Sequence, residues 1–164
     1  MIWIKKEKTN YQVYKLLSND EIANACTVPC LTEVLPLNIY LNDYAVLLCP
    51  EEENSRLFVF DDCKEYEYPE NIYDAILSGN SVYFITYTIV EKDGWYTHKP
   101  ESLYVRNFDK REALILSTNL ETPRFVGCLS DNSVLYCDSE NRLFKNRNQL
   151  YYISGTEKRF LIGY

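Results

Sequence analysis

This sequence has a single histidine, few glycines and prolines, and no long apolar run. Among its 164 residues, one is His, five are Gly and six are Pro. One histidine nearly excludes a catalytic triad or a histidine-rich metal site, and so little Gly and Pro excludes a low-complexity or linker protein. No segment reaches the ~18 apolar residues that a membrane-spanning helix needs. We therefore expect one folded domain, residues 1–164, that has no membrane partner.

Positive charge is scarce, because 24 acidic residues outnumber 17 basic ones and the net charge is −7. Such a surface repels a phosphate backbone, so we expect no nucleic-acid partner. The basic side chains Lys145, Arg147, Lys158 and Arg159 are interpreted as a solvated turn and tail. The acidic surface instead favours a protein partner with a basic surface.

Six cysteines are present, but the sequence does not predict disulfides or a metal. The stretch from Met1 to Lys6 lacks the charged lead and apolar run of a signal peptide, which favours a cytoplasmic protein with free thiols. Cys26 and Cys30 have a zinc-like spacing but lack two further ligands. Cys128 and Cys137 fall on adjacent predicted strands, where two thiols are able to face one another. We expect no metal and no cofactor.

What the chain does contain is a repeat. Three stretches read almost the same: Leu41–Leu48, Leu77–Phe84 and Leu129–Tyr136. Each combines an apolar strand end, a turn of Asn, Asp, Ser or Gly, and a second apolar strand. A multi-stranded unit that recurs at a period near forty residues predicts a repeated four-stranded meander.

The predicted strands follow this plan in each copy. The first copy has strands at 37–41, 44–49, 55–60 and 64–68, and the second at 71–77, 81–90, 102–107 and 112–117. The third has strands at 124–129, 133–137, 142–145 and 149–153. In the second copy, residues 91–101 are predicted to form a long loop.

The two chain ends look complementary. Residues 2–4 and 11–17 resemble the second and third strands of a unit whose first strand is missing. Residues 159–164 resemble a first strand without followers, because they match residues 124–129. Pairing the two ends would remove unpaired strand edges. Residues 18–36 fit the plan least well, although Pro29 suits an outer strand.

On these residues the repeat resembles the β-propeller proteins, in the broad sense that includes WD-type and kelch-type blades. The resemblance covers roughly residues 37–164, but the Trp-Asp dipeptide and the double glycine of those types are absent. It implies an all-β, small propeller of about four blades, closed by pairing of the C-terminal and N-terminal strands. Alternatives are a β-sandwich, or an oligomeric propeller in which two copies exchange strands to make a homodimer.

Candidate functional residues lie in the predicted long loop and beside the predicted first strands. Trp95, Tyr96 and His98 would form an aromatic contact surface for another protein. Arg124 and Arg159 precede equivalent strands and would reach a shared anionic ligand, which supports a small-ligand or lectin-like binder as the alternative.

Catalysis is not predicted. The carboxylate pairs, such as Asp61 with Asp62 and Glu65 with Glu67, lie in hairpins or on an outer strand, whereas glycoside hydrolysis needs two carboxylates across a cleft. The turn Ser78–Ser81 is not followed by the Gly-Lys-Ser/Thr of a phosphate-binding loop. We expect a non-catalytic protein-binding module. The many Asn, Ile, Tyr, Lys and Glu residues are compatible with a viral or phage protein that binds and modulates a host protein.

Overall fold

The computed structural model describes residues 2–7, 10–16, 21–29, 37–50, 54–60, 64–68, 71–110, 113–118, 120–142 and 145–163. Within these ranges every regular element is a β-strand, and every ladder between strands is antiparallel. The described segments include no helix long and apolar enough to cross a membrane. The chain forms two compact units, Met1–Glu70 and Asn71–Tyr164.

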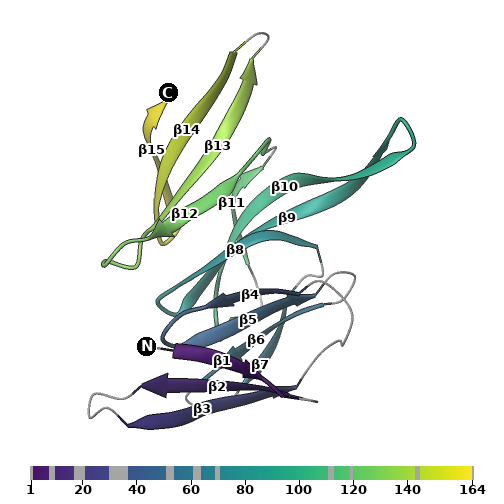
Figure 1. Cartoon of the computed structure of the whole chain (residues 1–164). Coiled ribbons are helices and arrows are strands. Elements are labelled where there is room, and N and C mark those ends of the chain that lie inside the picture. Colours follow the sequence, from purple (N-terminus) through teal and green to yellow (C-terminus); the bar gives the residue numbers. More distant parts are fainter. Residues whose placement is uncertain are drawn as a thin grey trace. The chain divides into compact units, whose positions relative to one another are not determined.

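The N-terminal unit contains two sheets (Figure 1). The three-stranded sheet has the order β1(Ile2–Lys6), β2(Asn10–Leu16), β3(Ile22–Pro29). The four-stranded sheet has the order β4(Leu37–Leu41), β5(Ala45–Pro50), β6(Ser55–Val59), β7(Glu65–Tyr68). Alternate residues of a strand point to the same face, and inward-facing residues of both sheets form a shared core: Tyr11, Val13, Cys26, Val46, Leu48, Phe58 and Phe60.

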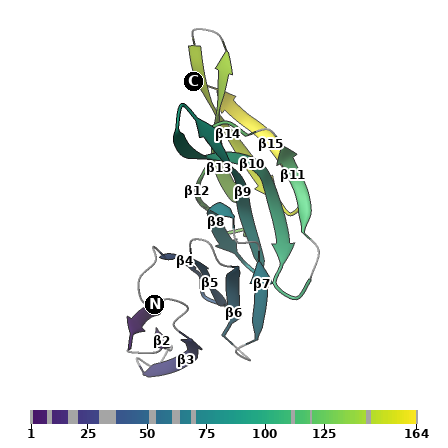
Figure 2. The same ribbon diagram turned by 90° about the vertical axis from the view of Figure 1, so that its right-hand side faces the viewer.

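The C-terminal unit contains two four-stranded meanders, which Figures 1 and 2 show from two directions. The first consists of β8(Ile72–Ser78), β9(Ser81–Lys92), β10(Trp95–Asn107) and β11(Leu114–Thr118). The second consists of β12(Arg124–Cys128), β13(Val134–Arg142), β14(Lys145–Ser154) and β15(Glu157–Gly163). Each strand pairs with its neighbour in the sequence, so short turns suffice to connect all of them.

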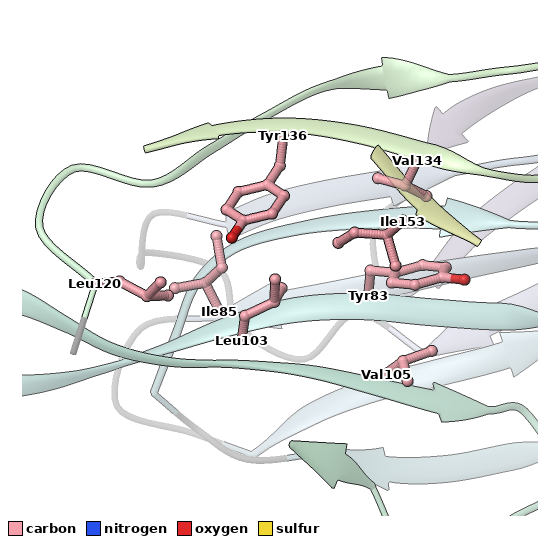
Figure 3. Close-up of a cluster of buried hydrophobic side chains, with 8 residues drawn as sticks. All are labelled: Tyr83, Ile85, Leu103, Val105, Leu120, Val134, Tyr136 and Ile153. Carbon is pink, nitrogen blue, oxygen red and sulfur yellow. The ribbon is translucent and has the colours of Figure 1, made fainter. Parts of the chain in front are cut away.

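A hydrophobic core holds these two meanders together. It is made of Tyr83, Ile85, Leu103, Val105, Leu120, Val134, Tyr136 and Ile153 (Figure 3). Seven of these come from the central strands β9, β10, β13 and β14, and those that share a strand stand at alternate positions, which point to the same face. Figure 3 shows the Tyr136 ring directed towards Ile85 and Leu103.

A half-buried carboxylate and a buried hydroxyl add directional contacts between the two meanders. The Phe125 amide of β12 donates to the Asp74 carboxylate of β8 at 3.0 Å. The Ser78 hydroxyl donates to the carbonyl oxygen of Asn132 at 2.7 Å, which joins the equivalent turns of two sequence repeats. These bonds fix the first strand of one meander beside the first strand of the next.

The prediction of an all-β chain with repeated four-stranded antiparallel meanders is confirmed. In the first two sequence copies, the strands β4 to β7 and β8 to β11 lie where the repeat predicts them, apart from the longer β10. No closed ring of sheets is found among the described residues. The propeller and its closure between the chain ends therefore stay predictions.

The third copy differs from the prediction in its last two strands. Of the strand predicted at 142–145, only Arg142 and Lys145 are among the described residues, and they pair with each other in the ladder between β13 and β14. Asp, Asn and Ser in this stretch are typical turn residues, but here they belong to the paired strands β13 and β14. The fourth strand is β15, which pairs with β14 and contains the residues predicted to be a first strand.

Tyr136 buries a hydroxyl that has no hydrogen-bond partner of normal geometry among the described residues. Its ring stacks on Tyr151 with a centroid distance of 4.9 Å. Burial, followed by the neighbouring Tyr151, raises the pKa of Tyr136, and burial raises the pKa of Tyr83 as well. The neighbouring Ser117, whose hydroxyl accepts a hydrogen bond from Lys158 at 3.0 Å, acts in the opposite direction on the pKa of Tyr136.

We predict that Tyr136→Phe leaves the free energy of unfolding at neutral pH unchanged or raises it by roughly 1 kcal/mol, because a buried unpaired hydroxyl is lost. The unfolded chain releases its tyrosine protons near the ordinary pKa of 10.0, while Tyr136 in the folded chain keeps its proton. Stability of the native chain should therefore fall as the pH rises above about 10. In the variant this fall should be smaller.

Urea unfolding of both proteins at neutral and alkaline pH measures this difference. An equal alkaline loss in native chain and variant would contradict the assignment of Tyr136.

Candidate binding surface

The residues predicted to form a long loop are instead a regular β-hairpin. β9 and β10 pair continuously from Ser81 with Asn107 to Lys92 with Trp95, apart from one irregularity between Pro100 and Ser102. Both strands extend beyond their sheet neighbours. Figure 1 shows this extension as the two-stranded ribbon that runs from the labels β9 and β10 to the turn at its tip. We call the extension, residues 88–99, the arm.

A two-residue turn explains why the arm forms. Asp93 and Gly94 connect the strands with φ angles of 54° and 79°. Two consecutive positive φ values define the type I′ turn, whose twist matches that of paired strands, and Asp-Gly is among its preferred sequences. This dipeptide was the signal in the sequence for a hairpin, and the prediction of a loop at 91–101 was wrong because it overlooked the dipeptide.

The arm begins where the neighbouring strands end. Asn71, next to β8, forms two hydrogen bonds with the backbone of Tyr87. The Tyr87 amide donates to the carbonyl oxygen of Asn71 at 3.0 Å, and the Asn71 side-chain amide donates to the carbonyl oxygen of Tyr87 at 2.6 Å. On the other edge, the ladder between β10 and β11 begins at Ser102. Beyond these points, the two strands of the arm pair with no described strand other than each other.

Every residue of the arm is exposed. The exposed fractions are 62% for Ile89, 38% for Val90, 77% for Trp95 and 73% for Tyr96. A two-stranded hairpin is only marginally stable in water by itself. Its exposed aromatic rings do not pack into a core that would stabilise it. The arm therefore carries apolar side chains where they contribute little to folding.

The arm has two faces with different side chains, because neighbouring residues of a strand point to opposite sides. The register places Tyr96 opposite Glu91 and His98 opposite Ile89 on one face, which we call the Tyr96 face. Trp95 lies on the other side, which we call the Trp95 face. Sequence reasoning grouped Trp95, Tyr96 and His98 into one surface; the structure brings together only the last two.

His98 is held in place by an aromatic neighbour. Its ring stacks on Tyr87 with a centroid distance of 4.2 Å and an interplanar angle of 28°. Tyr87 occupies the register position opposite Pro100, on the same face. The Tyr96 face is thus continuous from the turn to the base of the arm, and Ile89 and Tyr87 are members of it that the sequence did not reveal.

Arg124 and Arg159 do not occupy equivalent positions. Arg124 begins β12 and Arg159 lies on β15, at opposite edges of one sheet. Three strand spacings of about 4.8 Å separate them, or about 14 Å. Arg159 forms an exposed ion pair with Glu157 at 2.9 Å. The equivalence that suggested a shared anionic ligand is therefore wrong, because residues 157–163 form a fourth strand and not a first strand.

Among the basic side chains interpreted as a solvated turn and tail, Lys158 departs from that expectation. Lys158 is half-buried, donates a hydrogen bond to Ser117 at 3.0 Å and lies 4.1 Å from the ring centroid of Tyr151. Burial lowers the pKa of Lys158. The neighbouring Arg159 points to the other face of β15, and the side chains of Lys145 and Arg147 lie outside the described residues.

Cysteines give no metal centre among the described residues. The four described cysteines form no disulfide: Cys26, Cys49, Cys128 and Cys137. Cys128 pairs with Val134 in the register, whereas Cys137 pairs with Arg124, so these two thiols do not face one another. Within the described ranges no group of three or more His, Cys, Asp or Glu side chains gathers in one place. Cys30 and Cys63 lie outside the described residues.

Comparison with known proteins adds no identity: no protein-family model matches the sequence, and no curated protein matches it at a significant level.

We predict that Gly94→Ala weakens the arm without affecting the core. A methyl group at Gly94 meets no atom within 4 Å, so the cost comes only from the positive φ of 79°. That cost is about 1 kcal/mol for an L-residue in the left-handed region. Amide hydrogen exchange should become faster across residues 88–99, while the temperature of global unfolding changes little.

Gly127→Ala is the matched control. Its added methyl group also meets nothing within 4 Å, and no positive φ is involved. Exchange in the arm should be the same in this variant as in the native chain. Unchanged exchange in Gly94→Ala would contradict the assignment of a strained type I′ turn.

Proposed function

We propose that this protein is a non-catalytic module that binds another protein through the arm. The observation that carries the proposal is a two-stranded extension whose apolar side chains are exposed on both faces. Trp and Tyr are the residue types that most often dominate the binding energy of protein interfaces. Full burial of one such ring removes at least about 150 Å² from water, which corresponds to about 4 kcal/mol.

The arm also offers backbone groups to a partner. Within the part of the chain that the structure describes, no strand pairs with the outer edges of the arm beyond Tyr87 and Ser102. An extended segment of another protein can add a strand at such an edge. The side chains of the added strand would then lie alternately beside the Tyr96 face and beside the Trp95 face. The arm itself carries two acidic and two basic side chains, so steering towards a basic partner would come from the remaining surface with its net charge of −7.

The finer architecture belongs to the same proposal. Repeated four-stranded meanders, with the first strands of successive meanders side by side in the C-terminal unit, support a small propeller as the scaffold. Pairing between the first and last strands would close it. In a rigid scaffold of this kind, the arm would be presented from one blade. Because the chain is rich in Asn, Ile, Tyr, Lys and Glu, we also propose that it is of viral or phage origin and that its partner is a host protein.

We predict that the double variant Trp95→Ala with Tyr96→Ala loses partner capture by about tenfold or more, since truncating a hot-spot aromatic residue costs about 2 kcal/mol. Affinity capture from cells of the native source, with the captured protein quantified by mass spectrometry, measures the loss. Both side chains are exposed, so the free energy of unfolding should change by less than about 0.5 kcal/mol.

The matched control is Ile115→Ser with Val126→Ser. These side chains are 60% and 59% exposed and lie on β11 and β12, away from the arm. The control should capture as much partner as the native chain. Equal capture by the control and by the arm variant would refute the arm as the contact surface.

Single substitutions test which face is used. Because Trp95 and Tyr96 lie on opposite faces, a partner that covers one face should respond to one of the two alanine substitutions by about tenfold and to the other by less than about twofold. A partner that encloses the arm should respond to both. A partner that responds to neither would contradict the proposal.

A further inference from the structure

A cavity of about 340 Å³ lies in the C-terminal unit, away from the arm. It is bounded by the start of β9, the end of β10, the start of β11, and the turn between β14 and β15. Its volume is at the lower end of the range of small-molecule sites. The Tyr83 hydroxyl donates to the carbonyl oxygen of Gly155 at 3.4 Å, which ties that turn to the opposite sheet.

Two of the described residues that line this cavity are basic, although the protein as a whole is acidic. Arg106 and Lys110 line it, and none of the described residues that line it carries a carboxylate. The Arg106 Nε–H donates to the carbonyl oxygen of Lys110, which holds the guanidinium against the turn that carries the lysine. The carboxylate of Asp109, in the same turn, is not part of the lining. Both cations therefore lie along one wall.

Polar groups on the same wall and across from it are hydrogen-bond donors. The Ser81 hydroxyl donates to Asn107 Oδ1 at 2.8 Å, and this bond directs the NH₂ half of the amide away from Ser81. Thr156 contributes a hydroxyl from the β14–β15 turn. Donors from guanidinium, ammonium, amide and hydroxyl groups suit an anion with several oxygen atoms.

The remaining wall is apolar. Val105 is buried, whereas Leu114 is 56% exposed at the edge of the cavity. An apolar or planar group that covers Leu114 would remove this surface from water, while a bare anion would leave it exposed. The guanidinium of arginine matches the geometry of phosphate oxygens, and a lysine adds a point charge.

From this combination we infer that the cavity binds a small phosphate-bearing molecule with a planar or apolar part. The phosphate lies against Arg106, Lys110 and Thr156, and the other part packs on Leu114. This function is independent of the arm, whose residues take no part in the cavity. It also differs from the ligand expected at Arg124 and Arg159, which do not line the cavity.

Isothermal titration of the full chain with adenosine 5′-monophosphate, adenosine and inorganic phosphate tests the inference. The nucleotide should bind with a Kd of about 1 mM or tighter. Inorganic phosphate should bind more weakly and adenosine should not bind measurably. Lys110→Gln should weaken nucleotide binding by about tenfold, the usual effect of losing one charge-assisted hydrogen bond. Raising the salt to about 0.5 M should weaken it several-fold.

Lys92→Gln is the control, because it makes the same change of charge in the exposed arm. It should alter the Kd by less than about twofold if binding depends on contact with Lys110 and not on net charge. Circular dichroism of both variants confirms that they fold. Absence of nucleotide binding, equal binding of adenosine, or equal effects of the two substitutions would overturn the inference. Arm variants at Trp95 and Tyr96 should bind the nucleotide as the native chain does, so failure of the cavity and failure of the arm are distinguishable.

Discussion

The packing of two β-meanders around one core is the constraint on which the rest of the C-terminal unit depends. Tyr83 and Ile85 of β9 and Leu103 and Val105 of β10 are buried in that core, so the inner halves of both strands are fixed. The outer halves of the same two strands form the arm. The arm, which as a two-stranded ribbon has little stability by itself, is thereby a continuation of two strands that are anchored in the core. The cavity lies at the opposite, turn-bearing ends of these strands, near Asn107.

Much of the fold was readable from the sequence because one pattern recurs. Apolar residues alternate on either side of short Asn, Asp, Ser and Gly turns, and this alternation predicts antiparallel meanders wherever a face is buried. The prediction was wrong along β13 and β14, where the register pairs residues from Asp138 with Gln149 to Arg142 with Lys145. Local composition rich in Asp, Asn and Ser does not distinguish such a paired hairpin from a series of turns.

The candidate site was predicted in part for the same reason. Trp95, Tyr96 and His98 stood out as aromatic residues in a polar stretch, and the structure shows the first two to be among the most exposed apolar side chains described. Their division between two faces follows from the strand register, which depends on recognising the Asp93-Gly94 turn. The cavity was not predictable, because Arg106 and Thr156 are fifty residues apart and meet only through the packing of two sheets.

The most direct test of the account is photo-crosslinking from the arm inside cells of the native source. A photo-reactive amino acid in place of Tyr96 should give one discrete adduct with a different protein, and the same group in place of Ile115 should not give that adduct. The result that would contradict the account is the absence of any adduct from position 96, an adduct only with a second copy of this chain, or the same adduct from both positions.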